Sequence, residues 1–519
     1  MQRERRRRPS RRHDDEDAYR ERDEWLLQSR RSRRGGPPAE PPAPVRVVNR
    51  WWDRLLDVAD KRSFEGGASE YAANQTTRDY VLNTLGLGAW GALFPVLSIV
   101  ATQLAGAEQA GMFSMAFTTA TLMLYIGNYG VRTYQVSDID EADSFASYQV
   151  QRLITCAVML LIGFLWCSVR GYDHDMSLIT MGAFAFRAVD ALADTYEARL
   201  QQMDKLYLSG ISQAVRSVAG IVVFTVVLFV FHSLTMACMG MAIAAVASFA
   251  LLTLPLALLE TPKSRGVDLV EIQELFVECF PAFAAQFLFA LIETMPKFAM
   301  EGVLPYEDQV FFNAIYFPAQ SILMIVGFVY KPQLVRIANV WADRSKRARF
   351  DLIVVAMLAV SVVVTLVMLV VFGAVGIWLN GLMYGIDFEP YRMAQYLMIV
   401  AGGLSAAIDL LYQIITVLRR QAAATVLYLV AFVFVAVLSM ILVRVVGFNG
   451  AVYSYLAVMV VLLACLAMWR FPIEGNLPLM FYLYPTLFAM PFQWCAFAGA
   501  YGYKNSTIFS SNNVRQLVT

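Results

Sequence analysis

Long apolar runs separated by short polar loops occupy most of the chain between residues 80 and 471. A helix needs about 20 apolar residues to cross a bilayer core, and by that measure the pattern predicts twelve spans. A further apolar stretch, 477–503, is rich in aromatic residues and contains prolines, so it fits either a thirteenth span or a re-entrant hairpin. The predicted spans begin near Tyr80, Ala110, Leu153, Leu178, Ser217, Leu234, Leu275, Val310, Leu352, Ala394, Ala422 and Gly450.

Composition agrees with an all-α integral membrane protein. Of the 519 residues, 58% are hydrophobic and 16% are charged, whereas soluble domains carry roughly 25% charged residues. Residues 1–46 mix charges with Pro and Gly and predict a disordered basic tail. Residues 47–62 place Trp51 and Trp52 on the apolar face of an amphipathic helix, which favours the membrane surface over packing on protein. Residues 504–519 form a polar tail.

The distribution of Lys and Arg in the short loops predicts the orientation in the cell membrane. With the N-terminus in the cytoplasm, the outer connections carry only Arg170, Arg392 and Arg444. The inner connections then carry Arg132, Arg152, Arg199, Lys205, Lys263, Arg265, Lys331, Arg336, Arg344, Lys346, Arg347, Arg349, Arg419 and Arg420. We therefore expect a cytoplasmic N-terminus and short outer loops.

An internal repeat divides the spans into two sets of six. Residues 112–132 align without gaps on 311–331, and the same offset aligns 153–159 with 352–358. A slightly larger offset aligns "AVDAL" at 188–192 with "AIDLL" at 407–411 and so pairs Asp190 with Asp409. Because six spans restore the same orientation, we expect two parallel six-helix bundles, 79–260 and 275–472, with a site between them.

A charged stripe interrupts the fourth predicted span, in "FRAVDALADTYEARLQQ" from Phe186 to Gln202. Its polar positions, Arg187, Asp190, Asp194, Glu197 and Gln201, share one helical face. A charge near the bilayer midplane costs at least about 2–3 kcal/mol, so the stripe must face protein or a water-filled cavity. Arg187 and Asp190 could simply neutralise each other as an i,i+3 pair. The continuation of the stripe to Gln201 and the recurrence at Asp409 favour a hydrated cavity.

Other spans also contain charges and prolines that suggest function. Arg216, Glu293 and Lys297 lie within or at the ends of predicted spans. Pro296 precedes Lys297, and its mate in the repeat is Pro95. Because proline breaks a backbone hydrogen bond and bends a helix, bent first helices in both halves would suit a gate.

Several kinds of chemistry are disfavoured by the sequence. Its six cysteines lack a CxxC pair, and its three histidines stand in unrelated contexts, so we expect no metal site, no cofactor and no catalytic residues. "GLGAWG" at 86–91 matches GxGxxG, but it lies inside a span and is better explained as a small-residue packing face. The basic tail lacks interleaved aromatics, which favours anionic lipid over nucleic acid as its partner.

Residues 78–471 resemble the Wzx-type polysaccharide flippases of the multidrug/oligosaccharidyl-lipid/polysaccharide (MOP) exporter superfamily, whose fold is MATE- and MurJ-like. The resemblance rests on "TMPKFAMEGVLPYEDQVFFNAIYFPAQ" and "ADTYEARLQQMDKLYLSGISQAVR". It implies a protein of polysaccharide or lipopolysaccharide biosynthesis, not an enzyme, that flips undecaprenyl-diphosphate-linked oligosaccharide from the inner to the outer leaflet by alternating access. Membrane lipids and polysaccharide polymerase machinery are its expected partners.

The resemblance also suggests roles for the intramembrane charges. Members of this family have a cationic central cavity, which here implicates Arg187, Arg216 and Lys297, with Gln201 beside them, in binding the headgroup. The acidic residues would keep binding moderate and accept a coupling ion: Asp190, Asp194, Glu197, Glu293 and Asp409.

Two alternatives remain open at this stage. A MATE-type multidrug exporter would exchange organic cations for Na⁺ or H⁺ and should have a more acidic and aromatic cavity. An integral-membrane polysaccharide polymerase or glycosyltransferase usually carries its catalytic residues on a sizeable loop. The outer loops of this chain are short, which disfavours the enzyme.

Overall fold

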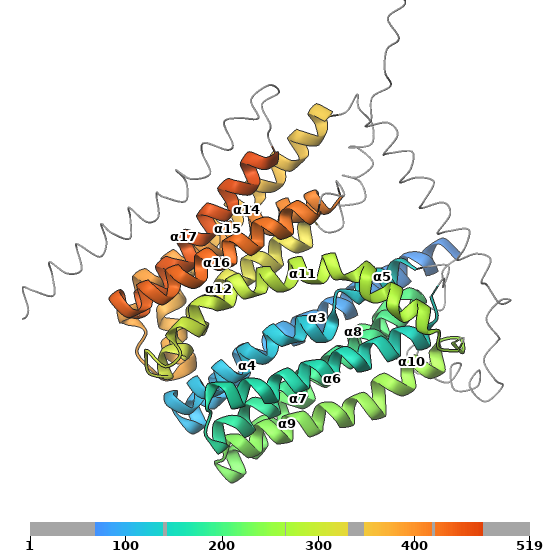
Figure 1. The fold of residues 1–519 in the computed structure, drawn as a ribbon, viewed down its shortest axis with the longest axis horizontal. Coiled ribbons are helices and arrows are strands. Elements are labelled where there is room, and N and C mark those ends of the chain that lie inside the picture. The colour runs from blue at the N-terminus through green and yellow to red at the C-terminus, as the bar shows by residue number, and fades with distance from the viewer. Residues whose placement is uncertain (1–67, 139–142, 265, 331–346, 418–420, 471–519) are drawn as a thin grey trace, which may run out of the picture.

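In a computed structural model, residues 68–138, 143–264, 266–330, 347–417 and 421–470 are described, and they form helices and no strand. Twelve of the described helices are long and apolar enough to cross a membrane. They form two bundles, seen as two lobes in Figure 1. The predicted all-α membrane fold is thereby confirmed. The predicted tail 1–46, surface helix 47–62, extra segment 477–503 and polar end 504–519 lie outside the described residues.

The first half contains six spans and one short helix. The sixth span continues from α9 through a π-helical turn into α10. The first turn of α10 contains Pro255, which has no backbone N–H and so cannot donate the hydrogen bond of a regular α-helix. The elements are α3 (Ala68–Ala105), α4 (Ala107–Asn128), α5 (Val131–Ser137), α6 (Phe145–Arg170), α7 (His174–Gln202), α8 (Leu206–Phe231), α9 (Leu234–Ser248), η1 (Phe249–Thr253) and α10 (Leu254–Glu260).

The second half repeats this packing. Contacts between α3 and α8, α4 and α7, α7 and α9, and α8 and α9 recur as α11 with α16, α12 with α15, α15 with α17, and α16 with α17. The predicted six-helix repeat is therefore present in three dimensions. Its elements are α11 (Leu269–Met300), α12 (Glu307–Tyr330), α14 (Arg347–Tyr384), η4 (Glu389–Tyr391), α15 (Arg392–Val417), α16 (Gln421–Val446) and α17 (Phe448–Arg470).

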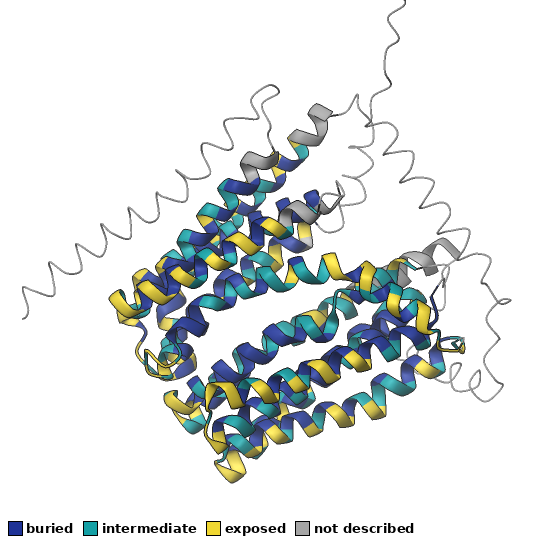
Figure 2. Ribbon diagram, viewed as in Figure 1, coloured by how far each residue is buried: buried dark blue, intermediate teal, exposed yellow. Residues whose placement is uncertain are grey.

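Burial separates central helices from lipid-facing ones. Figure 2 shows α4 and α7 largely buried. In α14, by contrast, Val362, Leu366 and Val370 are 56–72% exposed. Apolar side chains on the outer surface of a spanning helix face hydrocarbon, where exposure carries no hydrophobic cost.

Glycine contacts bring some helices unusually close together. A Cβ on Gly86 of α3 would lie 2.4 Å from the carbonyl oxygen of Gly210 in α8. No side chain fits there, so the two backbones touch as in small-residue membrane interfaces. At Gly86, the GxGxxG-like stretch thus acts as the packing face that the sequence predicted.

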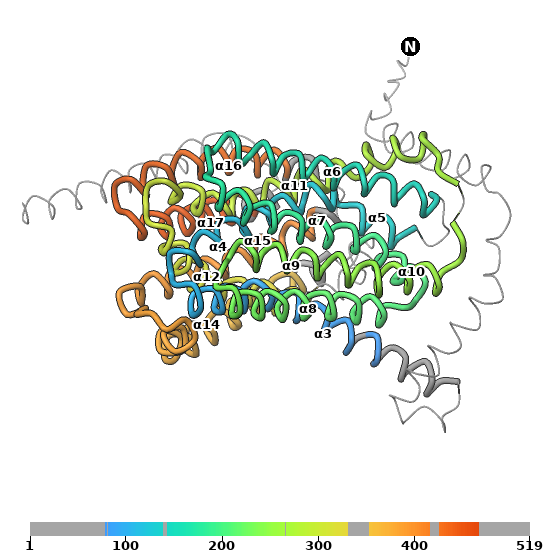
Figure 3. Tube along the Cα trace, turned by 90° about the horizontal axis from the view of Figure 1, so that it is seen from below, coloured from blue at the N-terminus to red at the C-terminus, as the bar shows by residue number. Residues whose placement is uncertain are grey.

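The two halves meet at one end of the molecule and separate toward the other. We define the closed end by segments 171–173 and 301–306, and the open end by α5 and α10 (Figures 1 and 3). Between the halves, α4 contacts α11 and α12, and α3 contacts α12 and α14. At the closed end, Gly111 of α4 lies against the backbone of Tyr306. On one side α11 also bridges the halves toward the open end, where Leu275 and Cys279 pack with Val131 and Tyr148.

Candidate functional site

A cavity between the two halves consists of two continuous chambers. The deep chamber has a volume of about 260 Å³ and reaches Ser98 and Tyr384, toward the closed end. The wide chamber has a volume of about 880 Å³ and reaches Asn83 and Gln413, toward the open end. Both chambers are lined by Trp90, Gly91, Tyr125, Glu293, Phe317 and Gln320, which form their shared waist.

The second half contributes Lys297 of α11 to the deep chamber. Its side chain is 6% exposed, and its Nζ lies 4.6 Å from the centroid of the Tyr316 ring and 5.9 Å from that of Phe312. Among the described residues, no carboxylate forms an ion pair with this ammonium and no group accepts a hydrogen bond from it. Aromatic faces stabilise a cation only in part, so Lys297 retains its capacity to bind an anion.

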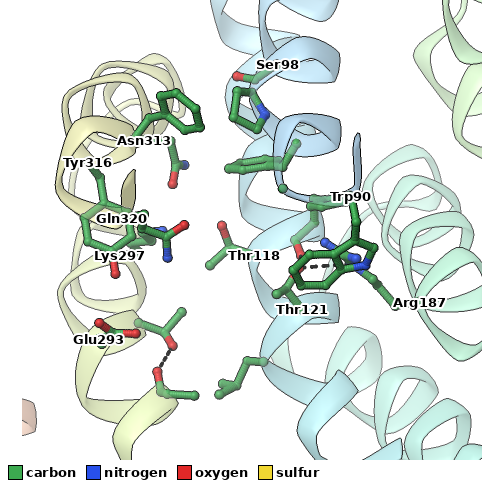
Figure 4. Close-up of a pocket in the computed structure, with 18 of the residues that line it drawn as sticks. Trp90, Ser98, Thr118, Thr121, Arg187, Glu293, Lys297, Asn313, Tyr316 and Gln320 are labelled. Atoms are coloured by element: carbon green, nitrogen blue, oxygen red, sulfur yellow. Dashed lines mark hydrogen bonds between the residues drawn. The ribbon is translucent and has the colours of Figure 1, made fainter. Parts of the chain in front are cut away.

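Two polar side chains accompany Lys297. Glu293, one turn earlier on α11, accepts hydrogen bonds from Ser405 at 3.0 Å and Tyr455 at 3.3 Å. Asn313 of α12 donates through Nδ2 to the carbonyl of Gln309 at 2.8 Å, whereas its buried Oδ1 has no partner among the described residues. An acceptor without a described partner and an ammonium without a direct ion pair therefore lie in one chamber, with the Glu293 carboxylate interacting electrostatically with Lys297 from one turn away (Figure 4).

The first half contributes Arg187 to the opposite wall. Figure 4 places it with Trp90 and Thr121, across the chamber from Lys297. Its Nε donates to Thr121 Oγ1 at 3.2 Å, and its guanidinium carbon lies 4.4 Å from the centroid of the Phe117 ring. Nη1 donates to Asp190 at 2.8 Å. Arg187 is thus a cavity residue whose position is fixed by its neighbours.

Behind Arg187, the charges neutralise one another. Arg216 of α8 donates to Asp190 and to Glu197 of α7, both at 2.7 Å. All these side chains are at most 4% exposed, and Ser212 gives Glu197 a further hydrogen bond at 3.0 Å. Removing one member of such a buried ionic set would leave an uncompensated charge.

This network differs from the cavity stripe expected from the sequence. Asp190, Glu197 and Arg216 line neither chamber, so the geometry does not support a headgroup role for Arg216 or an ion route through the two acids. The pairing of Arg187 with Asp190, the simpler of the two interpretations, is present. The physical reason is that Arg216 enters from α8 and occupies the face of α7 that the stripe defines.

Asp194 and Gln201, the remaining stripe residues, also lie outside both chambers. Asp194 accepts from Arg132 at 2.6 Å and from Arg152 at 3.0 Å, and Gln201 accepts from Arg132 at 3.0 Å. Arg152 is 1% exposed. In the sequence, the two arginines counted only as basic loop residues. Their ion pairs depend on how α5, which carries Arg132, and α6, which carries Arg152, pack against α7.

Asp409, the repeat mate of Asp190, lies in a different environment. It lines the wide chamber and accepts hydrogen bonds from Tyr330 and, at 3.5 Å, from Gln413. Tyr330 is the last residue of α12 and is buried, so its hydroxyl is held against Asp409 where the helix ends. The position equivalent to Arg187 is Ala406, and Asp409 has no ion pair with a described residue.

The two predicted gating prolines lie close to the cavity. Pro95 lines the deep chamber and Pro296 is buried in α11 directly before Lys297, whereas their gating role stays a prediction. Sequence reasoning missed Trp90 and the polar residues Asn313 and Gln320, although the last two interrupt an apolar span and were visible signals. Among the described residues, no group of three His, Cys, Asp or Glu side chains is placed to hold a metal ion.

Comparison with known proteins identifies the fold. No family model and no curated protein matches the chain. Among solved structures, it is similar to an inward-facing MATE family multidrug resistance transporter of the MOP superfamily, with a TM-score of 0.56 and 11% identity over 75% of this chain and 98% of that one.

Two further structures give the same result. A MOP superfamily transporter from Pyrococcus furiosus Vc1, described as having a binding pocket of reverse polarity, has a TM-score of 0.52 and 12% identity over 76% of this chain and 95% of that one. An outward-facing MATE family transporter has a TM-score of 0.52 and 10% identity over 76% and 94% of the two chains. The chain therefore has the twelve-span fold of the MATE transporters of the MOP superfamily.

Proposed function

We propose that the protein is a flippase that moves an undecaprenyl-diphosphate-linked oligosaccharide from the inner to the outer leaflet through the cavity between its halves. The observation that carries this proposal is the Lys297 ammonium, which is buried in the deep chamber without an ion-pair partner among the described residues. An intramembrane charge of this kind is costly and indicates a functional site. A diphosphate is a suitable partner because charge-assisted hydrogen bonds to phosphate are strong.

Other groups in the cavity fit a glycan attached to that diphosphate. Arg187 adds positive charge on the facing wall, while Asn313, Thr118 and Gln320 offer neutral donors and acceptors to hydroxyl groups. The wide chamber's volume of about 880 Å³ lies within the range of ordinary ligand sites. The lipid tail would remain in the bilayer while the headgroup passes between the halves.

The proposed orientation is compatible with transport from the inner to the outer leaflet. With the N-terminus in the cytoplasm, the open end faces the inner leaflet, where the precursor would be loaded. The described basic residues near this end, Arg132, Arg152, Arg199 and Lys205, agree with the positive-inside tendency. In this arrangement the closed end faces outward.

A MATE-type exporter of organic cations is the second candidate, because the wide chamber has its own distinct chemistry. It is lined by Glu293, Asp409, Phe289, Tyr412 and Tyr428. Carboxylates and aromatic faces together favour a cation. This candidate predicts that cargo binding depends on Asp409 and not on Lys297.

Lipid analysis of cells depleted of the protein tests the two candidates. Depletion is complemented with the wild-type protein, Lys297→Met, or Arg392→Gln; Arg392 is exposed and pairs only with the exposed Glu389 among described residues. We expect a defined undecaprenyl-diphosphate oligosaccharide to accumulate, and to be cleared by wild type and Arg392→Gln but not by Lys297→Met. Mass spectrometry would also identify the glycan.

Other outcomes would reject the proposal. Without any accumulating polyprenyl-diphosphate lipid, the flippase function is wrong. An increased susceptibility to cationic drugs, restored by Lys297→Met as well as by wild type, would establish the exporter instead.

A further inference from the structure

At the closed end, the buried carboxylate of Glu301 connects the two halves. Glu301 follows α11 of the second half, and its side chain is 5% exposed. It accepts a hydrogen bond from Tyr172, in the connection between α6 and α7 of the first half. Arg170, at the end of α6, lies 2.9 Å from the other carboxylate oxygen. Two residues of one half thus converge on one residue of the other.

Aromatic contacts hold these partners in position. Trp166 of α6 donates to the Tyr172 hydroxyl at 3.4 Å, and the Arg170 guanidinium lies 4.9 Å from the centroid of the Trp166 ring. The same ring lies 5.4 Å from Phe298 of α11. The hydrogen-bond donor Tyr172 and the ion-pair partner Arg170 are therefore held in place by packing that also crosses between the halves.

Gly111 makes a second contact at this end that does not involve Glu301. A Cβ on Gly111 of α4 would lie 1.9 Å from the carbonyl oxygen of Tyr306, in the connection before α12. Only glycine permits this approach of two backbones. A side chain introduced at Gly111 would therefore push the halves apart without changing Glu301.

Glu301 lies one helical turn after Lys297, the lysine of the deep chamber. The Lys297 carbonyl accepts from the Glu301 amide at 3.3 Å and from Gln309 Nε2 at 2.8 Å. Pro296, at the start of this turn, has no N–H to donate to the preceding turn. The last turn of α11 therefore lacks one backbone hydrogen bond to the preceding turn and has one side-chain bond, from Gln309, to the element after it.

From these contacts we infer that Glu301 is the latch of the closed end, and that its release from Tyr172 and Arg170 is required before the cavity can open there. The inference concerns the empty transporter and holds whatever the cargo is. A buried carboxylate suits this role because its charge must be satisfied in either state. Closed, it is held by Tyr172 and Arg170; open, it is exposed to water.

Distance measurements across the closed end test the latch. Spin labels at Val169→Cys and Val303→Cys, which are 84% and 44% exposed in the two halves, report their separation in cargo-free protein in nanodiscs, with the native cysteines replaced. We expect Glu301→Gln to increase, at least several-fold, the fraction of molecules that show the longer distance of the open state. Gly111→Ala should do the same by steric pressure, whereas Glu389→Gln, which removes an exposed pair within the second half, should leave the distribution unchanged.

A second variant, Tyr172→Phe, keeps the test decisive. If Glu301→Gln does not fold, Tyr172→Phe replaces it, since this change deletes only the hydroxyl that binds Glu301. Distributions for the Glu301 or Tyr172 variant that superimpose on wild type would overturn the latch. A shift seen with Gly111→Ala alone would also overturn it, because backbone packing would then hold the closed end.

Discussion

The two halves share one fold but use their intramembrane charges differently. In the first half, Arg187, Asp190, Arg216 and Glu197 form a continuous buried set in which every charge has an opposite partner. In the second half, Lys297 and Asp409 line the cavity without an ion pair to any described residue. The first half therefore uses charge to hold its helices together, and the second half presents charge to the cavity.

This difference shows why a charge inside the membrane does not by itself identify a binding group. Both sets lie within helices long and apolar enough to span a membrane, and Asp190 and Asp409 are repeat mates. What separates them is the neighbouring helix, because α8 supplies Arg216 in one half and no described cation meets Asp409 in the other. The two halves should therefore lose different amounts of stability when one of these charges is removed.

The largest effect is expected at Asp190. Asp190→Ala leaves Arg187 and Arg216 buried without their shared carboxylate, and breaking a buried ionic set costs about 3–5 kcal/mol. The free energy of unfolding, measured by denaturant titration in mixed micelles, should fall by that amount. Asp175→Ala, at an exposed position of the same helix, should change it by no more than about 0.5 kcal/mol.

A smaller loss of stability is expected at Asp194. Asp194→Asn weakens its bonds to Arg132 and Arg152, but Arg132 is 33% exposed, and Arg152 keeps hydrogen bonds to Gly127, Asn128 and Thr195. We expect a decrease of about 1–3 kcal/mol in the free energy of unfolding. A decrease larger than that of Asp190→Ala would show that the main structural network of the first half lies at α5 and not at Arg216.

In the second half, Asp409→Asn should have only a modest effect. Tyr330 can donate to an amide oxygen as it does to the carboxylate, so the cost should stay near about 0.5–1.5 kcal/mol, that of one hydrogen bond. Thermal unfolding of the purified protein measures this. An effect as large as that of Asp190→Ala would erase the distinction between the halves.

The smallest loss is expected at Lys297. Lys297→Met removes a buried ammonium that has no described ion-pair partner and keeps a flexible apolar chain of similar length. Because desolvation of the ammonium is removed with it, stability should change by less than about 1 kcal/mol or increase. Strong destabilisation would assign Lys297 a structural role.

The sequence predicted the twelve spans and the repeat because the bilayer imposes length and hydropathy on each helix separately. It also placed Arg187, Lys297, Glu293 and Asp409 correctly as intramembrane charges. It could not decide which of them face the cavity. Helical periodicity defines a face of α7, but whether Arg216 or water covers that face depends on how α8 packs, and this information is not local.

The site residues missed by the sequence have similar explanations. Asn313 and Trp90 belong to the cavity because α12 and α3 face each other across it, a relation between the two halves that no single span encodes. The burial of Arg152 on α6 depends on α4 and α7, which supply Gly127, Asn128, Asp194 and Thr195 as its partners, and a hydropathy pattern does not encode such contacts.

Binding of undecaprenyl diphosphate to purified wild type, Lys297→Met and Lys297→Arg, compared in nanodiscs at matched thermal stability, tests the central claim most directly. A charge-assisted hydrogen bond contributes about 1.5–3 kcal/mol, so Lys297→Met should weaken binding by about tenfold or more, and Lys297→Arg should retain most of it. Equal affinity of wild type and Lys297→Met would contradict the claim that the second half presents this charge to an anionic cargo.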